Sequence, residues 1–180
     1  MLLKNARHAL KLWLTNVRVA RRYDVLIEKS VTIKYEDTIS FGEHVTLQSG
    51  AYLYGSRTGQ EVRLGHHVVI AASAMILGEG GVSIGDYTHV GPGAVLTSQY
   101  GDAAGPMITA APTIKTAPIR VGRGSWIGSG AVLMPGATLG ERSVVAPGSV
   151  VYGRFGDGVT LSGNPARPMR PVRGRDPGAA

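Results

Sequence analysis

The sequence predicts a left-handed parallel β-helix, and three observations lead to this fold class. An aliphatic residue recurs every six positions from Ile27 onward, with a small or branched residue four positions after it. Glycine is abundant, at 26 of 180 residues, as tight turns require. Apolar residues make up 43% of the chain and aromatic residues only 6%, so the core must consist of small aliphatic side chains. The length suits a single domain.

The six-residue register defines a series of short units. They begin at Ile27, Phe41, Leu47, Leu64, Ile70, Ile84, Val90, Val121, Ile127, Leu133, Leu139 and Val145. We expect the first residue of each unit to point into a narrow prism, the fifth to face inward near a corner, and Gly or Pro-Gly to form the turns. One unit cannot bury its own apolar face, so stability must come from stacked coils. A β-sandwich would instead show alternation of period two.

The chain divides into three parts. Residues 1–24 are expected to form a basic amphipathic helical segment, residues 25–160 the β-helix, and residues 161–180 a C-terminal segment with Gly-Asn-Pro-Ala-Arg and a flexible tail. The longest break in the register is the extruded loop 97–118. A loop of this length is usually functional, so we expect an arm that reaches toward a substrate or a neighbouring subunit. A mobile surface excursion is the alternative.

Basic residues gather at both ends of the chain, which has 19 Lys and Arg against 12 Asp and Glu. Near the N-terminus an apolar stripe has helical spacing, at Leu3, Ala6, Leu10, Trp13 and Val17. A basic amphipathic helix can lie on an anionic membrane, so residues 1–22 are a candidate for peripheral membrane contact. The alternative is that the stripe packs on the β-helix or on its copy in another subunit.

Composition also excludes several classes of site. The absence of cysteine excludes disulfides, thiolate metal sites and a thiol nucleophile. No apolar stretch is long enough to span a bilayer, and residues 1–20 lack the pattern of a signal peptide. We therefore expect a cytoplasmic protein, at the inner face of the membrane if residues 1–22 contact it. Nucleic-acid binding is disfavoured, because no recognised binding motif accompanies the basic residues.

The stretch from Val121 to Arg170 resembles the hexapeptide-repeat acyltransferases, particularly the sugar O-acetyltransferases of the galactoside, maltose and colanic-acid type. The resemblance rests on Trp-Ile-Gly at 126–128, within a run of unbroken repeats, and on Leu-Ser-Gly-Asn-Pro-Ala-Arg-Pro at 161–168. It implies an acyl-CoA-dependent transferase that uses acetyl-CoA and no metal. It further implies a sugar acceptor, or a precursor of an envelope polysaccharide, and a homotrimer with active sites between adjacent prisms.

The resemblance also implies roles for individual residues. Ser129, Gly130 and Ala146 would line the pantetheine arm of acetyl-CoA, and Arg167 and Arg170 would approach its nucleotide phosphates. The forked guanidinium of arginine suits such phosphate groups.

The acceptor site is expected to involve the long loop. Trp126 would form a wall of that site by resemblance. Gln99 and Tyr100 open the loop, where they could contact the acceptor.

The catalytic base departs from the family's pattern. Acyl transfer to a hydroxyl needs a base, commonly histidine, which in related enzymes follows an aliphatic-Thr-Ser-like segment at the start of the long loop. Here Gln99 or Tyr100 occupies that place, and the ordinary tyrosine pKa near 10 makes a poor base at neutral pH. His89 is the sixth residue of its unit and should point outward, so it is the first candidate. Asp102 is the second, and an ordinary surface histidine is the alternative reading.

Two further functions remain open at this stage. One is a non-catalytic trimeric β-helix, a scaffold or binding protein that has lost the loop histidine. The other is a γ-type carbonic anhydrase, which shares the fold and needs three histidine ligands at a subunit interface. The spacing of His66, His67 and His89 does not match that family's pattern.

Overall fold

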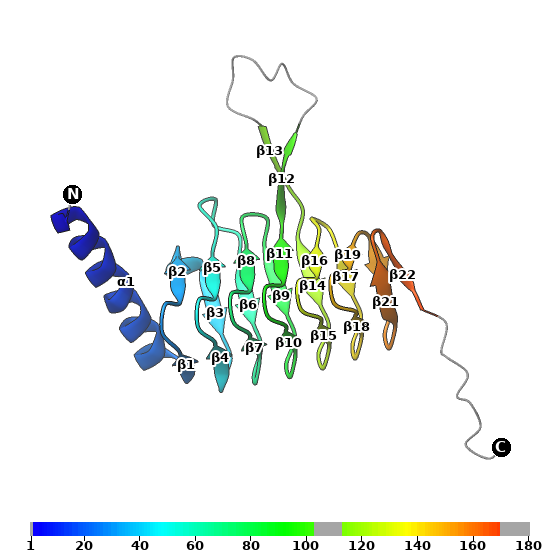
Figure 1. Cartoon of the computed structure of the whole chain (residues 1–180), viewed down its shortest axis with the longest axis horizontal. Helices are drawn as coiled ribbons and strands as arrows, with labels where there is room; N and C mark the ends of the chain where they lie inside the picture. The colour runs from blue at the N-terminus through cyan, green and yellow to red at the C-terminus, as the bar shows by residue number, and fades with distance from the viewer. Residues whose placement is uncertain (1, 103–112, 170–180) are drawn as a thin grey trace.

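The computed structural model describes residues 2–102 and 113–169. These residues form a parallel β-helix of six stacked coils with one helix at its N-terminal end (Figure 1), so the predicted left-handed β-helix is confirmed. Each coil contributes one short strand to each of three sheets, which we name A, B and C in chain order. Neighbouring coils pair in parallel, with a spacing of about 4.8 Å.

The elements have the following bounds. The helices are α1 (Leu2–Arg22) and the short 3-10 helix η1 (Glu36–Thr38). Sheet A contains β1 (Val25–Ile27), β4 (Val45–Leu47), β7 (Val69–Ile70), β10 (His89–Val90), β15 (Trp126–Ile127), β18 (Val144–Val145), β21 (Thr160–Gly163) and β22 (Ala166–Pro168). Sheet B contains β2 (Thr32–Lys34), β5 (Tyr52–Tyr54), β8 (Met75–Leu77), β11 (Val95–Thr97), β16 (Val132–Leu133) and β19 (Val150–Val151). Sheet C contains β3 (Ile39–Phe41), β6 (Val62–Leu64), β9 (Val82–Ile84), β14 (Ile119–Val121), β17 (Thr138–Leu139) and β20 (Arg154–Phe155).

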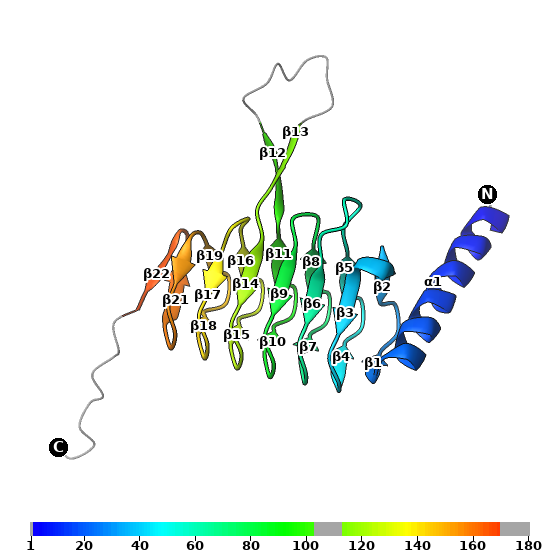
Figure 2. The ribbon, with the colours of Figure 1, turned by 180° about the vertical axis from the view of Figure 1, so that it is seen from behind.

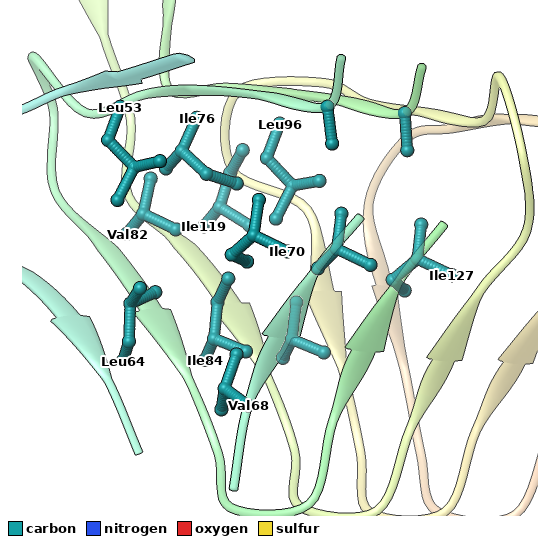
Figure 3. Packing of buried hydrophobic residues seen from close by; sticks show 14 of the residues in the cluster. Leu53, Leu64, Val68, Ile70, Ile76, Val82, Ile84, Leu96, Ile119 and Ile127 are labelled. Atoms are coloured by element: carbon teal, nitrogen blue, oxygen red, sulfur yellow. The ribbon is translucent and has the colours of Figure 1, made fainter. Parts of the chain in front are cut away.

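The hexapeptide register explains the core. A strand such as β4 joins the fifth and sixth residues of one unit to the first of the next, so Val45 and Leu47 are buried and Thr46 between them faces outward. Coil after coil, the inward residues form one aliphatic column (Figure 3). Each fully buried Val, Leu or Ile stabilises the fold by roughly 1.5–3 kcal/mol relative to exposure.

The long break in the register is a β-hairpin. Strand β12 (Gln99–Asp102) pairs antiparallel with β13 (Thr113–Thr116), and residues 103–112 between them lie outside the described part of the chain. The hairpin leaves the prism at the corner between sheets B and C and projects away from the coils in both views (Figures 1 and 2). The predicted extrusion is therefore present, with a two-stranded ribbon at its base.

Helix α1 packs on the first coil with a face that the sequence pattern did not indicate. Thr15 and Val19 are buried against the β-helix, and the Asn16 side chain donates a hydrogen bond to the Val31 carbonyl at 2.9 Å. The predicted stripe through Leu10, Trp13 and Val17 lies on another side of α1. Leu10 and Trp13 of that stripe are exposed, whereas Val17 is half-buried and, with Trp13, borders a groove against the first coil. Over the described residues, no helix has the length and apolarity needed to cross a bilayer.

Candidate active site

The first candidate residues meet on the outer face of sheet A. Strands β10 and β15 are adjacent, and their register sets His89 beside Trp126 on neighbouring coils. The two rings stack with their centroids 4.3 Å apart and an interplanar angle of 15°. Both residues occupy the sixth position of a unit and point outward, as predicted for His89. One face of the Trp126 ring covers His89. The Trp126 side chain is nevertheless 53% exposed, so its other surface is in contact with solvent.

The stacking changes the acid–base properties of His89. Its ring is partly buried, and this loss of solvent lowers its pKa below the usual histidine value because burial disfavours the charged imidazolium. Within residues 2–102 and 113–169, neither ring nitrogen of His89 has a hydrogen-bond partner. The imidazole is therefore neutral near pH 7, and it keeps a nitrogen able to accept a proton.

Ser129 and Gly130 lie at the corner between sheets A and B, on the same coil as Trp126. The Ser129 carbonyl accepts a hydrogen bond from the Gly148 N–H, and the Gly130 N–H donates to the Pro92 carbonyl. No described residue accepts from the Ser129 N–H. That donor is exposed at the corner and can bind an external carbonyl.

On the two adjacent coils the equivalent corner position carries no such donor. Pro92 and Pro147 occupy these positions and have no N–H. On an earlier coil the Ala72 N–H is satisfied by the Gln48 side chain at 3.2 Å. Between Ala72 and Gly163, the described residues at this corner thus leave one unpaired N–H, that of Ser129; Lys29 on the first coil carries another.

The remaining cofactor candidates continue toward the C-terminal end. Ala146 lies at the same corner one coil beyond Ser129, and its N–H donates to the Leu161 carbonyl. Arg167 is exposed in β22, where its guanidinium donates to the Ala166 carbonyl at 3.1 Å. Arg170 lies outside the described residues. The described candidates form a line down one edge of sheet A, which suits an elongated ligand.

The hairpin residues are not brought to His89 within one chain. Gln99 and Tyr100 stand in β12 and pair with Thr116 and Lys115, and Asp102 ends the same strand. The hairpin leaves the corner between sheets B and C, which is the corner opposite sheet A. An active site that uses both sets of residues must therefore combine two copies of the chain.

Sequence reasoning missed the contrast between the three outer faces. The outward residues of sheet B are mostly apolar, namely Tyr52, Met75, Val95, Val132 and Val150. Sheet A similarly presents Val69, His89, Trp126 and Val144. Sheet C instead presents Ser40, Arg63, Ser83, Arg120, Thr138 and Arg154. The residue at the sixth position of each unit determines the chemistry of these outer faces. The contrast becomes visible only when the units are grouped by the sheet to which they belong.

The described residues include no group of three His, Asp or Glu side chains arranged to hold a metal ion. His66 and His67 lie at a turn between sheets C and A. His66 accepts a hydrogen bond from the Glu43 N–H at 3.1 Å, and His67 stacks between His44 and Tyr87.

Comparisons with known proteins agree with the repeat architecture. Residues 118–153 match the family described as bacterial transferase hexapeptide (six repeats). The chain is 28% identical over 151 residues to galactoside O-acetyltransferase of Escherichia coli (strain K12), covering 83% of this chain and 72% of that protein. It is 26% identical over 147 residues to WcaF of the same strain, whose name assigns it to colanic acid biosynthesis, covering 82% and 66%.

A solved structure gives the same result for the whole fold. The N-acyltransferase AntD from Bacillus cereus, in complex with dTDP and 3-hydroxybutyryl-CoA, superposes with a TM-score of 0.72 at 25% identity. The match covers 82% of this chain and 79% of AntD. The resemblance to hexapeptide-repeat acyltransferases is confirmed by these matches.

Proposed function

Since this chain is a left-handed β-helix of which residues 118–153 match the transferase hexapeptide family, we propose that it is an acyl-CoA-dependent transferase that acts on a sugar. The donor would be acetyl-CoA, and the acceptor a sugar or a sugar-containing precursor of an envelope polysaccharide. The observation that carries the proposal is the His89–Trp126 pair, a neutral imidazole with an unpaired nitrogen on an exposed aromatic wall. The likeness to galactoside O-acetyltransferase and to WcaF supports the class of acceptor.

His89 would act as the general base. Its neutral nitrogen takes the proton from the attacking hydroxyl or amine as the new bond forms to the acyl carbon, and the C–S bond of the thioester breaks. The proton then passes to the departing thiolate, which leaves as CoA. A lowered pKa keeps the imidazole in the accepting form at neutral pH. Trp126 would hold the sugar against the histidine, and Asp102 is the weaker candidate for the base.

The edge of sheet A would hold acetyl-CoA. The unpaired N–H of Ser129 can donate to an amide carbonyl of the pantetheine arm, and Gly130, with φ of 64°, has no neighbouring atom within 4 Å of a Cβ position. Ala146 extends this contact line. Arg167 and Arg170 carry the charge that the phosphates require.

A homotrimer would complete the active site. The hairpin that carries Gln99 and Tyr100 leaves the prism at the corner opposite sheet A, so these residues would contact the acceptor of a neighbouring prism. A cyclic trimer requires two different contact surfaces on each subunit, and the outer faces of sheets A and B are two apolar surfaces of this kind.

The direct test combines binding and turnover. The protein is incubated with radiolabelled acetyl-CoA and a panel of sugars, and CoA binding is measured by calorimetry. We expect binding and label transfer to at least one sugar. Absence of both CoA binding and transfer would contradict the proposal.

A second candidate is a non-catalytic trimeric scaffold or binding protein, favoured by Gln99 and Tyr100 at the loop position where related enzymes place histidine. It predicts binding without turnover. The variant His89→Ala separates the two functions, because removal of a general base lowers kcat about 10²–10⁴-fold. His67→Asn is the matched control, since Asn tolerates the positive φ of 55° at that position.

A further inference from the structure

Helix α1 has two opposite faces; one packs on the first coil, and most of the other is exposed. Leu12, Thr15, Asn16 and Val19 have the spacing of one helical face, and this face packs on the first coil. Leu10, Trp13, Leu14 and Val17 repeat the same spacing two residues earlier, which places them about 200° around the helix. Leu10, Trp13 and Leu14 are 55%, 60% and 45% exposed. These four residues are named the outer face of α1.

Positive charge flanks this outer face. Lys11, Arg18 and Arg22 share a third side of the helix, and Arg21 lies in its last turn. The whole of α1 contains six Lys or Arg and no Asp or Glu. Arg18 is 3.4 Å from the Glu36 carboxylate, while Lys11 and Arg21 are exposed and have no carboxylate partner among the described residues. An apolar strip beside unneutralised positive charge is complementary to an anionic lipid surface.

The position of α1 leaves the outer face accessible. The helix lies at the N-terminal end of the β-helix, beside β1 (Figures 1 and 2). Leu10, Trp13 and Leu14 are exposed, and Trp13 and Val17 also border a groove between α1 and the first coil. An apolar groove of about 820 Å³ runs between α1 and β1 and extends this surface to Leu26, which is 63% exposed. The residues proposed to bind CoA lie at the far end of the prism.

We propose that the outer face of α1 docks the end of the β-helix on an anionic phospholipid bilayer. Leu10, Trp13 and Leu14 insert at the level of the headgroups, where tryptophan is favoured, and the basic flank contacts lipid phosphates. The prism then stands on the membrane by its N-terminal end, and a sugar acceptor attached to a lipid becomes accessible to the transferase. The docking does not depend on the proposed enzymatic activity.

Co-sedimentation of the full-length protein with vesicles tests this proposal. The vesicles contain phosphatidylcholine alone or phosphatidylcholine with phosphatidylglycerol. We expect binding to the anionic vesicles only, weakened at high salt because exposed charges are screened. The variant Lys11→Gln/Arg21→Gln should lower the partition coefficient about 25-fold, since one basic residue near an anionic surface contributes about fivefold. Leu10→Ser/Trp13→Ser/Leu14→Ser should lower it at least tenfold.

Matched controls change similar side chains elsewhere on the prism. Tyr152→Ser removes an exposed ring near the other end, and Arg154→Gln removes an exposed charge from sheet C; neither should alter vesicle binding. Circular dichroism and light scattering on each variant report folding and mass. The proposal is wrong if the wild type ignores anionic vesicles at low salt, or if the triple variant binds like the wild type. A smaller oligomer for the triple variant would show that the outer face contacts another copy instead.

Discussion

At the scale of single residues, the six-residue register turns His89 outward, and the next coil sets Trp126 against it. The imidazole loses water on the covered side, so its charged form is disfavoured and its pKa falls. A base with this environment stays unprotonated to lower pH than an ordinary histidine. Activity that depends on it should fall only when the pH drops through this lowered pKa.

The Trp126 ring that shields His89 from solvent can be removed by mutation. Trp126→Ala restores solvent to the ring of His89, so the pKa of His89 should rise toward the ordinary value of about 6.5. Proton NMR titration of the histidine Hε1 signals measures this change, with His89→Asn used to assign the resonance. The acid limb of kcat/KM should move to higher pH in the same variant. The signals of His44 and His67, which stack elsewhere, should not shift. A pKa unchanged by the substitution would exclude the tryptophan as its cause.

Ser129 offers a test of CoA binding that changes one N–H. Pro92 and Pro147 occupy the equivalent corners of the adjacent coils, so Ser129→Pro suits the backbone there and removes the unpaired donor. We expect unchanged thermal stability and a CoA dissociation constant about tenfold higher, the effect of one lost hydrogen bond. Ser129→Ala keeps the N–H and should bind CoA like the wild type. Equal affinity for both variants would remove Ser129 from the binding site.

The sequence predicted the outward direction of His89 but not its neighbour. Direction follows from the position of a residue within one hexapeptide. The neighbour depends on which residue the next coil brings to the same height, and the excursion at 97–118 hides that alignment. The hairpin at the base of the excursion was also not predicted, because Gln99–Asp102 and Thr113–Thr116 follow neither the six-residue register nor a clear alternation.

At the scale of elements, the close spacing of coils explains glycine at the second position of many units. A Cβ on Gly140 would lie 2.4 Å from the Asp157 nitrogen and 2.4 Å from the Gly156 carbonyl carbon, both backbone atoms of the next coil. Gly156 occupies the equivalent position, but a Cβ there would meet no atom within 4 Å. The requirement for glycine at this position therefore comes from the coil below.

These two glycines form a matched pair for a stability measurement. Gly140→Ala should destabilise the fold by about 1–3 kcal/mol, the usual cost of overpacking, and lower the melting temperature. Gly156→Ala should leave it unchanged or raise it slightly, because alanine reduces the freedom of the unfolded chain. Thermal unfolding followed by circular dichroism measures both. If Gly156→Ala destabilises the fold as much as Gly140→Ala, the coil that contains Gly156 must pack against another part of the protein or another subunit in solution.

The hairpin is an element that the coils do not need. The Ala117 N–H bonds to the Ser98 carbonyl below the ribbon, so the coil is closed without residues 99–116. Replacing these residues by a short Gly-containing turn should keep the melting temperature and CoA binding, while transfer to the acceptor falls at least a hundredfold. Unaltered transfer would show that Gln99, Tyr100 and Asp102 do not reach the acceptor.

Helix α1 shows that apolar periodicity alone does not identify the packed face. Its packed face includes Thr15 and Asn16, and a hydrogen bond from Asn16 anchors it to Val31. The more apolar stripe is exposed at Leu10, Trp13 and Leu14. Periodicity reports where apolar residues gather, but it does not report which surface they meet.

At the scale of the whole molecule, the three outer faces differ in chemistry. The outward residues of sheets A and B are mainly apolar and aromatic, and those of sheet C are mainly arginine, serine and threonine. The prism core is complete within one chain, so these apolar rows are not needed for folding. Two unlike apolar faces on one subunit are what a closed ring of heterologous contacts requires.

A charge placed on one such face should separate the subunits. Val132→Glu adds a carboxylate to the outward row of sheet B, and burying it against an apolar partner without a cation costs several kcal/mol. We expect light scattering to show a trimer for the wild type and a smaller species for this variant, with transfer lost because His89 and the hairpin stand at opposite sides of one prism. Thr138→Glu adds the same charge to sheet C and should remain trimeric and active. A monomeric wild type that transfers acetyl groups would show that one prism holds the whole site.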